Sequence, residues 1–540
     1  MYVDPEKTQA YSIYTLIIIC FAAAIISTFQ FIQNDQYVGN DSTQYLVGAE
    51  SLRNGEGFST RILFFDEHYT SGEVPAPQTV WPPGLSILIV AFDLVGVDME
   101  DGARIISAIA YILLIAGVYF LVFALTNSIA ISVLASVWQL LVVDMWRYSG
   151  GIGSDIIFTA ISTWCILIYA SAMKKSFKNE QSISIPYSTL ALMSLVAGIG
   201  FCFRYTSVFL IAWIMLLIFI EFVRGIRSDP SSWLKQFFYS ALAALPSLLC
   251  FIFLVARNLI ISGSIKGGNT KVVYNPIIDL AVETVRSFVI VLTGVTKADF
   301  FDASFLLIIV GSLPLIFLVI GVAGVAIRFA KSVISRKFDT WQDFCCFMIV
   351  VFVAIYIAGL IIISSRSFAS YGSRYLLSAM PLAIVVIVSL WRKYQWGLWI
   401  GIGALSISQF IYLQANLLPS SAPGVDHKSA YLETANWIAE NTDRSDRVFA
   451  FGDSQRIGYH IKRPTLAVPI KHFTSETWDE NRFKKLALQY DVKVLIASKN
   501  DSPEEYEEIA NKLMMGEGIG WIQLSKSTDN TFIYTINEDP

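Results

Sequence analysis

Long apolar segments recur along the whole 540-residue chain, and they restrict the fold more than any other feature of the sequence. A membrane-spanning helix needs about 20 mainly apolar residues. The candidate segments are Ile13–Phe31, Ala103–Leu125, Ile129–Val143, Ile156–Met173, Tyr187–Phe203, Tyr205–Phe222, Phe237–Ala256, Phe305–Ala330, Phe344–Ile363, Tyr375–Trp391 and Gly397–Ala415. Only 15% of the residues are charged, against about 25% in soluble proteins. The sequence therefore predicts an α-helical polytopic membrane protein.

The first apolar segment predicts a retained membrane span rather than a cleaved signal peptide. Ile13–Phe31 is longer than the apolar core of a signal peptide, which has about 7–15 residues. The small residues Ala22-Ala23-Ala24 lie in the middle of this segment. A signal peptidase would need them at its end.

Basic residues predict which ends of the segments face the cytoplasm, because short loops rich in Lys and Arg are retained there. Such loops contain Lys174–Lys178, Arg224–Lys235, Arg328–Lys337 and Arg392-Lys393. This threading places the amino terminus in the cytoplasm and the first loop, residues 32–100, on the outer side. We therefore expect a multi-pass protein of a bacterial inner membrane with an extracytoplasmic carboxyl-terminal tail.

The apolar segment Trp81–Val97 does not fit the alternation. A full crossing here would turn Lys174–Lys178 outward, against the charge bias. We expect a re-entrant segment, or one lying along the outer face, that begins at Pro82-Pro83. The alternative is an additional pair of crossings, so the sequence predicts about eleven to thirteen spans.

The composition changes after Pro419, which predicts a membrane domain, residues 1–419, and a tail domain, residues 420–540. Helical patterns and short strand-like runs alternate in the tail. They are Ser429–Glu440, Asp479–Tyr490 and Pro503–Met515 for helices, and Arg447–Ala450, Val492–Ala497 and Phe532–Ile536 for strands. The tail is predicted to be a small water-soluble α/β domain.

Asp41 lies in the first outer loop, immediately before a segment with one apolar stripe. The stripe consists of Tyr45, Leu46, Ala49 and Leu52. It predicts a helix that lies flat at the membrane interface. Asp41 and Gln44 have the spacing of a capping box, so Asp41 as a helix cap is one interpretation. The other is a reactive carboxylate, and the two are compatible because a helix start favours the ionised form.

Asp155 follows the glycine-rich segment Gly150–Ser154 and precedes the apolar segment Ile156–Met173. The segment is not a phosphate-binding P-loop, because it lacks the Lys-Ser/Thr pair and no strand precedes it. A helix cap is again the simpler interpretation of Asp155. The threading nevertheless places Asp155 and Asp41 on the same outer surface, where two carboxylates can converge.

Several cations are also expected on the outer side, where the charge bias gives little reason for them. An Arg at mid-bilayer costs about 2.5–3.5 kcal/mol or more, so we expect Arg204 at the interface or in a polar cavity. For each cation alone, a structural or snorkelling role explains the position equally well. The candidate substrate-binding residues are Arg204, Arg257, Asn258, Lys266, Arg374 and Tyr375.

Seven short stretches resemble, in order and over nearly the whole chain, the GT-C glycosyltransferases that use polyprenyl-phosphate sugars. This class includes protein mannosyltransferases and lipid A aminoarabinose transferases. The stretches are Asp41–Tyr45 with Gly55 and Gly57, Trp81–Leu85, Ala103-Arg104, Ser154–Thr159, Gly198 with Phe203–Thr206, Arg257-Asn258 with Gly263, and Ser373–Pro381. The chain departs from the pattern at Ser378, where Pro is usual, at Asp155, where Glu is frequent, and at Asn40-Asp41, where many members have Asp-Glu.

The resemblance implies inverting transfer of a sugar from a polyprenyl-phosphate donor on the outer face. It gives Asp41 the role of catalytic base and Asp155 an assisting role or a role in binding a divalent metal ion. These roles suit the residue types. A carboxylate can take the proton of an acceptor hydroxyl, and cations stabilise a departing phosphate.

A membrane glycosyltransferase is therefore the leading hypothesis, with a lipid, a glycan or a protein as the acceptor. The alternative is a lipid or sugar transporter without glycosyl transfer, although no repeat between the two halves is visible. A third hypothesis is an assembly or sensor protein that binds a partner through its tail. The net charge of −4 provides no basic field for nucleic acid, which is not expected as a partner.

Overall fold

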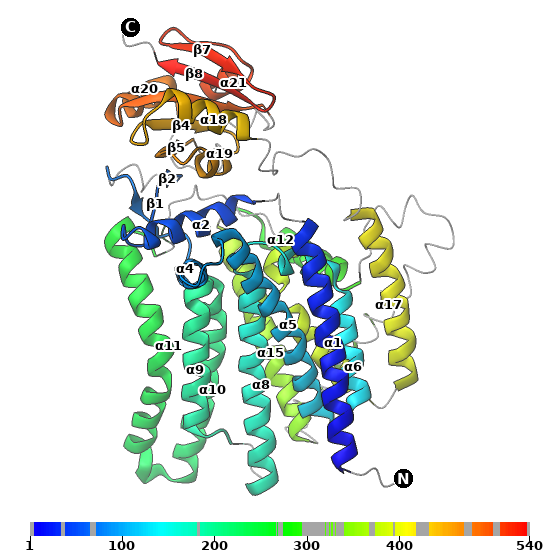
Figure 1. Ribbon diagram of the computed structural model, residues 1–540. Helices are drawn as coiled ribbons and strands as arrows, with labels where there is room; N and C mark the ends of the chain where they lie inside the picture. Colours follow the sequence, from blue (N-terminus) through cyan, green and yellow to red (C-terminus); the bar gives the residue numbers. More distant parts are fainter. Residues whose placement is uncertain are drawn as a thin grey trace.

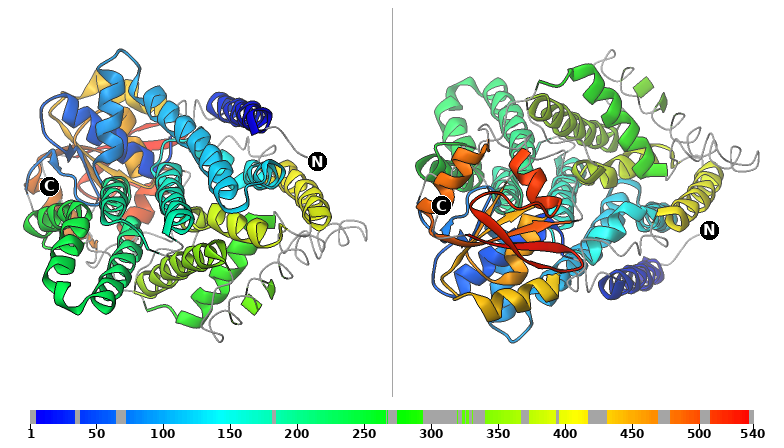
Figure 2. Two further views of the ribbon diagram at one scale, coloured as in Figure 1. Left: turned by 90° about the horizontal axis from the view of Figure 1, so that it is seen from below. Right: turned by 90° about the horizontal axis from the view of Figure 1, so that it is seen from above.

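Helices form a bundle, and a smaller α/β domain covers part of one end of it (Figure 1). The computed structural model describes residues 5–33, 38–64, 72–180, 184–265, 267, 274–293, 340–366, 373–392, 395–416, 431–468, 478–499 and 508–536, and six isolated residues between 319 and 330. Viewed along the bundle, the tail domain lies over the part that contains α2 (Asn40–Arg53) and α9 (Tyr187–Phe203) and leaves α17 (Gln395–Asn416) uncovered (Figure 2).

Helices build the bundle and the layer across its end. They are α1 (Pro5–Gln33), α2 (Asn40–Arg53), α4 (Gly84–Asp93), α5 (Met99–Thr126), α6 (Ile129–Leu141), α7 (Val143–Ser149), α8 (Asp155–Glu180), α9 (Tyr187–Phe203), α10 (Val208–Ser228), α11 (Trp233–Ser262), α12 (Ile277–Thr293), α15 (Trp341–Ser364), α16 (Met380–Leu390) and α17 (Gln395–Asn416), with the 3-10 turns η1 (Tyr205–Ser207), η2 (Pro230–Ser232) and η3 (Ser373–Leu376). Within the described residues, six helices are long and apolar enough to cross a membrane, or seven if α6 and α7, which meet at 71°, form one broken span.

The predicted apolar segments are helical where the structure describes them, apart from Val142 and the turn residues 377–379 and 391. Phe305–Ala330 lies largely outside the described residues. Arg204 separates α9 from η1 and α10 with an extended backbone. The two helices pack side by side, so α9 and α10 form a helical hairpin. The polytopic helical architecture is confirmed.

The structure is needed to assign two segments, because the sequence patterns did not identify their helices. Trp81–Val97 contains only α4, whose 10 residues span about 15 Å at 1.5 Å per residue, about half the hydrocarbon core of a bilayer. The segment 257–300, in which no span was predicted, contains the helix α12. Its charges at Asp279, Glu283 and Arg286 lie on one helical face, which hid it from a search for uniformly apolar segments.

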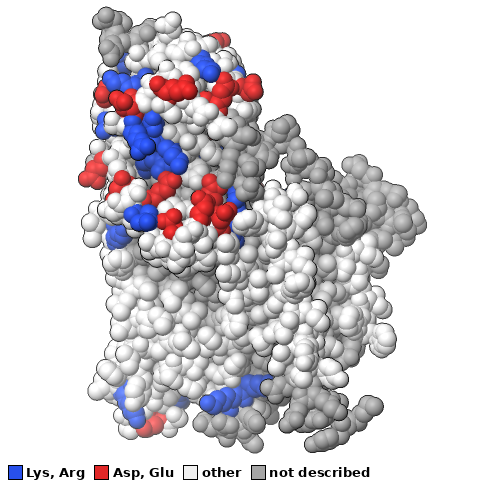
Figure 3. All heavy atoms as spheres, viewed as in Figure 1, with Lys and Arg blue, Asp and Glu red and all other residues white. Residues whose placement is uncertain are grey.

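Charged side chains gather at the two ends of the molecule. Between them, the visible face of the bundle carries a broad band without Lys, Arg, Asp or Glu (Figure 3). This distribution is that expected of a protein whose middle faces lipid and whose ends face water and headgroups. The amino terminus of α1 lies at the end opposite the tail domain (Figure 1).

The tail domain contains a six-stranded sheet with the order β2-β5-β4-β6-β8-β7, in which β2 is Ile62–Leu63. The elements from the tail are α18 (Leu432–Asn441), β4 (Arg447–Phe451), α19 (Ser454–Ile461), β5 (Thr465–Ala467), α20 (Glu480–Gln489), β6 (Val492–Ser498), α21 (Glu508–Met514), β7 (Ile522–Ser527) and β8 (Thr531–Ile536). Strands β2, β5, β4 and β6 are parallel, whereas β8 and β7 are antiparallel to their neighbours.

One edge strand of this sheet comes from the first loop. The loop forms β1 (Ser59–Thr60), β2 (Ile62–Leu63) and β3 (Ala76–Pro77), and β2 pairs with β5. Because successive residues of a strand face opposite sides, Ile62 packs in the core of the membrane domain while Leu63 packs in the core of the tail. The two predicted domains thus share a sheet.

Helix α2 lies across the end of the bundle, beneath the tail domain (Figure 1). It contacts α4 and α5 of the membrane domain and α19 of the tail. Nine of its residues are buried, including Thr43 and Gln44 on its polar side. The predicted helix therefore exists and lies flat, but it is covered by protein on both sides.

Candidate active site

Asp41 is the second residue of α2, which begins after Gly39. The side chain of Gln44, predicted to belong to a capping box, instead accepts hydrogen bonds from Thr60 Oγ1 at 3.2 Å and from Gln78 Nε2 at 2.9 Å. Asp41 as the helix cap is therefore wrong. Its carboxylate lies within the first turn, where the positive end of the helix dipole favours a negative charge.

Two hydrogen bonds join α2 to the glycine-rich segment that precedes α8. Ser42 Oγ donates to the carbonyl oxygen of Ile152 at 2.7 Å, and the hydroxyls of Tyr45 and Ser154 lie 2.9 Å apart. The segment also packs tightly on α1, since a Cβ atom at Gly150 would lie 2.5 Å from the backbone of Gln30. These contacts bring the start of α2 beside the start of α8.

Asp155 is the first residue of α8, and its carboxylate is held by two arginines. Arg204 Nη1 lies 2.6 Å from Asp155 Oδ1. Arg374 Nε donates to Oδ1 at 3.1 Å and to Oδ2 at 3.2 Å. The expected convergence on one end of the bundle is thus present, and Asp155 acts as an ion-pair partner.

Arg374 bridges the two carboxylates. Its Nη2 atom lies 2.5 Å from Asp41 Oδ2, while its Nε atom binds Asp155. The exposed fractions of the side chains are 34% for Asp41, 31% for Arg374, 9% for Arg204 and 3% for Asp155. The four formal charges sum to zero, with Asp41 and Arg374 on the accessible side and Asp155 and Arg204 inside.

Tyr375 completes this group, which we call the ionic cluster: Asp41, Asp155, Arg204, Arg374 and Tyr375. The guanidinium carbons of Arg204 and Arg374 lie 5.3 and 5.8 Å from the centre of the Tyr375 ring. These are distances at which a cation is attracted to an aromatic face. The ring therefore stabilises two like charges that would otherwise only repel each other.

Side chains from two helices fix η3, which carries Arg374 and Tyr375. The hydroxyl of Tyr356 in α15 donates to the carbonyl oxygen of Tyr375 at 2.8 Å. The hydroxyls of Thr159 in α8 and Ser378 lie 3.1 Å apart. Ser378, a departure from the GT-C pattern, thus contributes a hydrogen bond that Pro has no side-chain group to make.

Electrostatics keeps the two arginines charged. Burial disfavours the charge of Arg374, but the carboxylates of Asp155 and Asp41 outweigh it, so the pKa of Arg374 lies above its ordinary value. Burial is likewise outweighed by Asp155 at Arg204, whose pKa is also raised. Burial raises the pKa of Tyr45, so its hydroxyl stays neutral beside Ser154.

Arg257 and Asn258, at the end of α11, belong to a neighbouring group. Arg257 Nη2 donates to the carbonyl oxygen of Phe58 at 3.3 Å, and its guanidinium lies 5.5 Å from the centre of the Phe58 ring. Asn258 Nδ2 donates to the Tyr205 hydroxyl at 3.1 Å. Tyr205 follows Arg204 directly, so this group adjoins the ionic cluster through η1.

The ion pairs and hydrogen bonds between described residues do not join Arg257 or Asn258 to either carboxylate. Lys266, the remaining predicted substrate-binding residue, lies outside the described residues. The structure thus brings Asp41 and Asp155 into one cluster with three of the six predicted substrate-binding residues, Arg204, Arg374 and Tyr375.

The sequence analysis did not predict that Tyr45, Ser154 and Tyr356 hold the ionic cluster in place. Tyr45 follows Asp41 by four residues and so shares its helix face, a signal that was available. Ser154 adjoins Asp155. Tyr356 lies in an otherwise apolar span, where a buried hydroxyl is expected to find a polar partner.

The arrangement does not fit the divalent metal ion that the resemblance left open. The Arg374 guanidinium contacts both carboxylates and supplies the positive charge between them. Mg²⁺ and Ca²⁺ take about six or more oxygen ligands. Among the described residues, no group of three or more His, Cys, Asp or Glu side chains is positioned to hold a metal.

Solved structures with a similar fold span most of the chain. The archaeal oligosaccharyltransferase AglB from Archaeoglobus fulgidus, in complex with an inhibitory peptide and a dolichol-phosphate, matches with a TM-score of 0.54 and 12% identity over 98% of this chain and 74% of that chain. The apo form of the Archaeoglobus fulgidus oligosaccharyltransferase gives 0.50 and 13% over 91% and 70%. ArnT from Cupriavidus metallidurans bound to undecaprenyl phosphate gives 0.44 and 12% over 97% and 98%, a score too low to support an argument.

No protein family and no curated protein sequence matches the chain. Because the sequence identity to AglB is only 12%, the similarity shows a shared fold. The predicted GT-C architecture is confirmed at that level.

Proposed function

We propose that this protein is a membrane glycosyltransferase that moves a sugar from a polyprenyl-phosphate donor to an acceptor hydroxyl on the extracytoplasmic face. The observation that carries the proposal is the meeting of Asp41 and Asp155 on Arg374, at the end of the bundle that bears the tail domain. The fold gives further support, because AglB, which shares it, was solved with a dolichol-phosphate.

Asp41 is the proposed general base. It is the more exposed of the two carboxylates, so an acceptor hydroxyl can approach it. As the hydroxyl oxygen bonds to the anomeric carbon, Asp41 takes its proton. The bond from that carbon to the phosphate oxygen breaks on the opposite side, and its electron pair leaves with the polyprenyl phosphate. The anomeric configuration is inverted.

Arg374 is the proposed partner of the departing phosphate. Its guanidinium has five N–H donors, and about a third of its side chain is exposed. Charge-assisted hydrogen bonds to phosphate strengthen as negative charge develops on the leaving oxygen. Arg204 pairs with Asp155 on the buried side of the cluster and adds a second positive charge near the proposed phosphate site.

Asp155 is proposed as a positioning residue. Its buried carboxylate binds Arg374 with both oxygens and Arg204 with one. These contacts fix the orientation of the Arg374 guanidinium. Arg257 and Asn258 extend the polar surface beyond η1 and are proposed to bind the donor there. Its prenyl chain would remain in the bilayer, because each CH₂ withdrawn into water costs about 0.8 kcal/mol.

Product analysis tests this proposal against transport. The purified full-length protein would be placed in liposomes with a polyprenyl-phosphate sugar labelled in the sugar, together with pooled acceptor lipids and glycans from cell envelopes. The expected result is a labelled glycoside and one free polyprenyl phosphate for each sugar transferred. Movement of the labelled donor between leaflets without any glycoside would overturn the proposal in favour of a transporter.

A further inference from the structure

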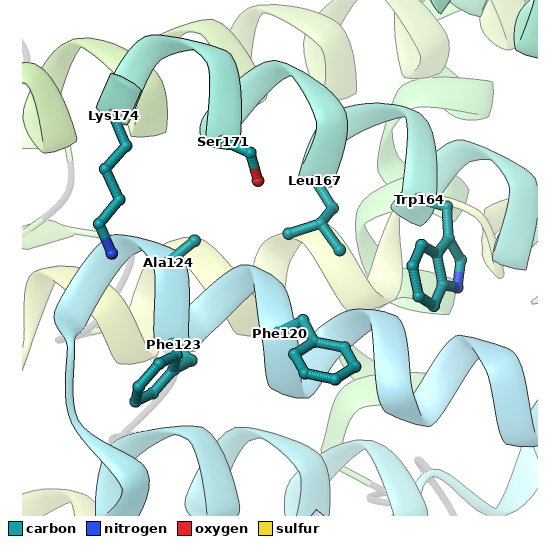
Figure 4. A pocket seen from close by; sticks show the side chains of 7 residues that line it. All are labelled: Phe120, Phe123, Ala124, Trp164, Leu167, Ser171 and Lys174. Carbon is teal, nitrogen blue, oxygen red and sulfur yellow. The ribbon is translucent and has the colours of Figure 1, made fainter. Parts of the chain in front are cut away.

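A groove opens between α5 and α8 (Figure 4). Its face of α5 is expected to contact lipid, because α5 exposes the apolar side chains of Ile109, Leu113 and Phe120. It has a volume of about 340 Å³, within the range of about 300–1,000 Å³ for small-molecule sites. Its walls are mainly apolar and include Phe120, Phe123, Trp164 and Leu167, and Lys174 stands at one end. The described lining residues include no acidic side chain.

The groove follows from the sizes of side chains along the two helices. At Gly117 the helices nearly touch, since a Cβ atom there would lie 3.1 Å from both Thr163 Cγ2 and Trp164 Nε1. Further along, the small residues Ala124 and Ser171 face the space between the helices. Small side chains at this level leave a hollow that larger ones would fill.

The position of the groove separates it from the ionic cluster. Lys174 follows Asp155 by 19 residues of α8 (174 − 155), which corresponds to about 28 Å at 1.5 Å per residue. This is close to the thickness of a bilayer's hydrocarbon core, about 30 Å. Lys174 therefore lies near the other membrane boundary, where the amino terminus also lies.

Positive charge concentrates at this end of the groove. Lys174 Nζ donates to Asn127 Oδ1 at 2.6 Å, and Arg392 Nη1 donates to the carbonyl oxygen of Leu125 at 3.2 Å. Lys175 is exposed beside them. The visible face of this end carries mainly Lys and Arg side chains, with fewer acidic ones, below the uncharged band (Figure 3). The Asn127 contact holds the Lys174 ammonium at the mouth of the groove.

We propose that this groove binds an anionic phospholipid. One acyl chain lies along the aromatic wall of Phe120 and Trp164, and the phosphate pairs with Lys174. A lipid-facing groove is filled by lipid, and basic pockets between membrane helices on the cytoplasmic side select anionic headgroups. The charge at the mouth favours an anionic lipid over a neutral one, and the apolar wall favours a lipid over free phosphate. The proposal does not depend on the proposed glycosyl transfer.

Photo-crosslinking tests the proposal with the full-length protein in phosphatidylcholine vesicles that contain a trace of phosphatidylglycerol bearing a diazirine on one acyl chain. Crosslinks are expected on peptides of α5 and α8 that line the groove. Unlabelled phosphatidylglycerol should compete, whereas phosphatidylcholine should compete at least fivefold less well. Equal competition by the two lipids, or by glycerophosphoglycerol without acyl chains, would overturn the proposal.

Two variants separate the headgroup from the chain. Lys174→Gln should lower the apparent affinity for phosphatidylglycerol about fivefold, the equivalent of about 1 kcal/mol per basic residue at a membrane surface. Ser171→Leu should abolish crosslinking in the groove by filling it. Lys235→Gln, which removes a cation near the start of α11 outside the groove, is the matched control and should change nothing. An unchanged affinity in Lys174→Gln would overturn the proposal even if Ser171→Leu fails to fold.

Discussion

The buried pair of Arg204 and Asp155 allows a prediction about stability that is independent of any substrate. Their side chains are 9% and 3% exposed and meet at 2.6 Å. Removing one partner of a buried ion pair costs about 3–5 kcal/mol, because the other charge is left uncompensated. The two partners are not equivalent here. Asp155 keeps Arg374 when Arg204 is lost, whereas Arg204 loses its only carboxylate partner among the described residues when Asp155 is neutralised.

The structure therefore predicts an order of effects. Arg204→Met should lower the free energy of unfolding by about 3 kcal/mol, at the low end of the range, and Asp155→Asn should lower it by more. The double variant should cost less than the sum of the two, with a coupling of about 1–3 kcal/mol, as expected for residues in contact. Arg374 and Asp41 remain in place in each variant.

Unfolding in mixed micelles with increasing SDS, followed by circular dichroism, measures these differences. The matched control is Arg286→Met, because Arg286 and Glu283 form an exposed pair at 3.5 Å that should contribute no more than about 1 kcal/mol. Effects of the two cluster variants that add within about 0.5 kcal/mol, or a larger loss for Arg204→Met than for Asp155→Asn, would refute the reasoning.

Further outcomes follow from the contacts around the site. Arg61→Ala removes an ion pair with Glu50 and a hydrogen bond to the Tyr459 carbonyl, and it should increase hydrogen exchange in β5 and α19. The control Arg53→Ala, which removes a more exposed ion pair, should not. Equal hydrogen exchange in the two variants would contradict the shared-sheet account. Arg257→Gln should raise the KM for the donor about tenfold, the equivalent of a charge-assisted hydrogen bond of about 1.5 kcal/mol, and unchanged kinetics would remove Arg257 from the donor site. Washing with EDTA should leave the rate of sugar transfer unchanged, because Arg374 supplies the positive charge between the two carboxylates. Loss of transfer that is restored by Mg²⁺ or Mn²⁺ would show that a metal ion, and not Arg374 alone, supplies this charge.

The apolar segments and the charge bias predicted much of the membrane domain. Arg204 illustrates why this works, because an arginine between two apolar segments must reach a polar boundary. The threading from the charge bias predicted Asp155 near the same boundary, and the two residues form an ion pair there. The role of Arg374 as a bridge did not follow, because no local pattern specifies which of several cations reaches both carboxylates.

The shared sheet is the clearest case of structure beyond local pattern. Ile62 and Leu63 are too few to show the alternation that identifies a strand, and their partner strand β5 lies about four hundred residues further along the chain. The helix α12 differs, because its amphipathic spacing was present in the sequence. It was missed because a length rule for uniformly apolar segments excludes helices with one charged face.

The rate of sugar transfer by Asp41→Asn tests the central claim most directly. The measurement uses saturating labelled donor and single-turnover conditions, so that chemistry is observed rather than product release. Loss of a general base predicts a rate lowered by about 10²–10⁴-fold, with partial activity in Asp41→Glu and full activity in the control Asp93→Asn, which alters an exposed pair with Arg53. A wild-type rate in Asp41→Asn would contradict the account.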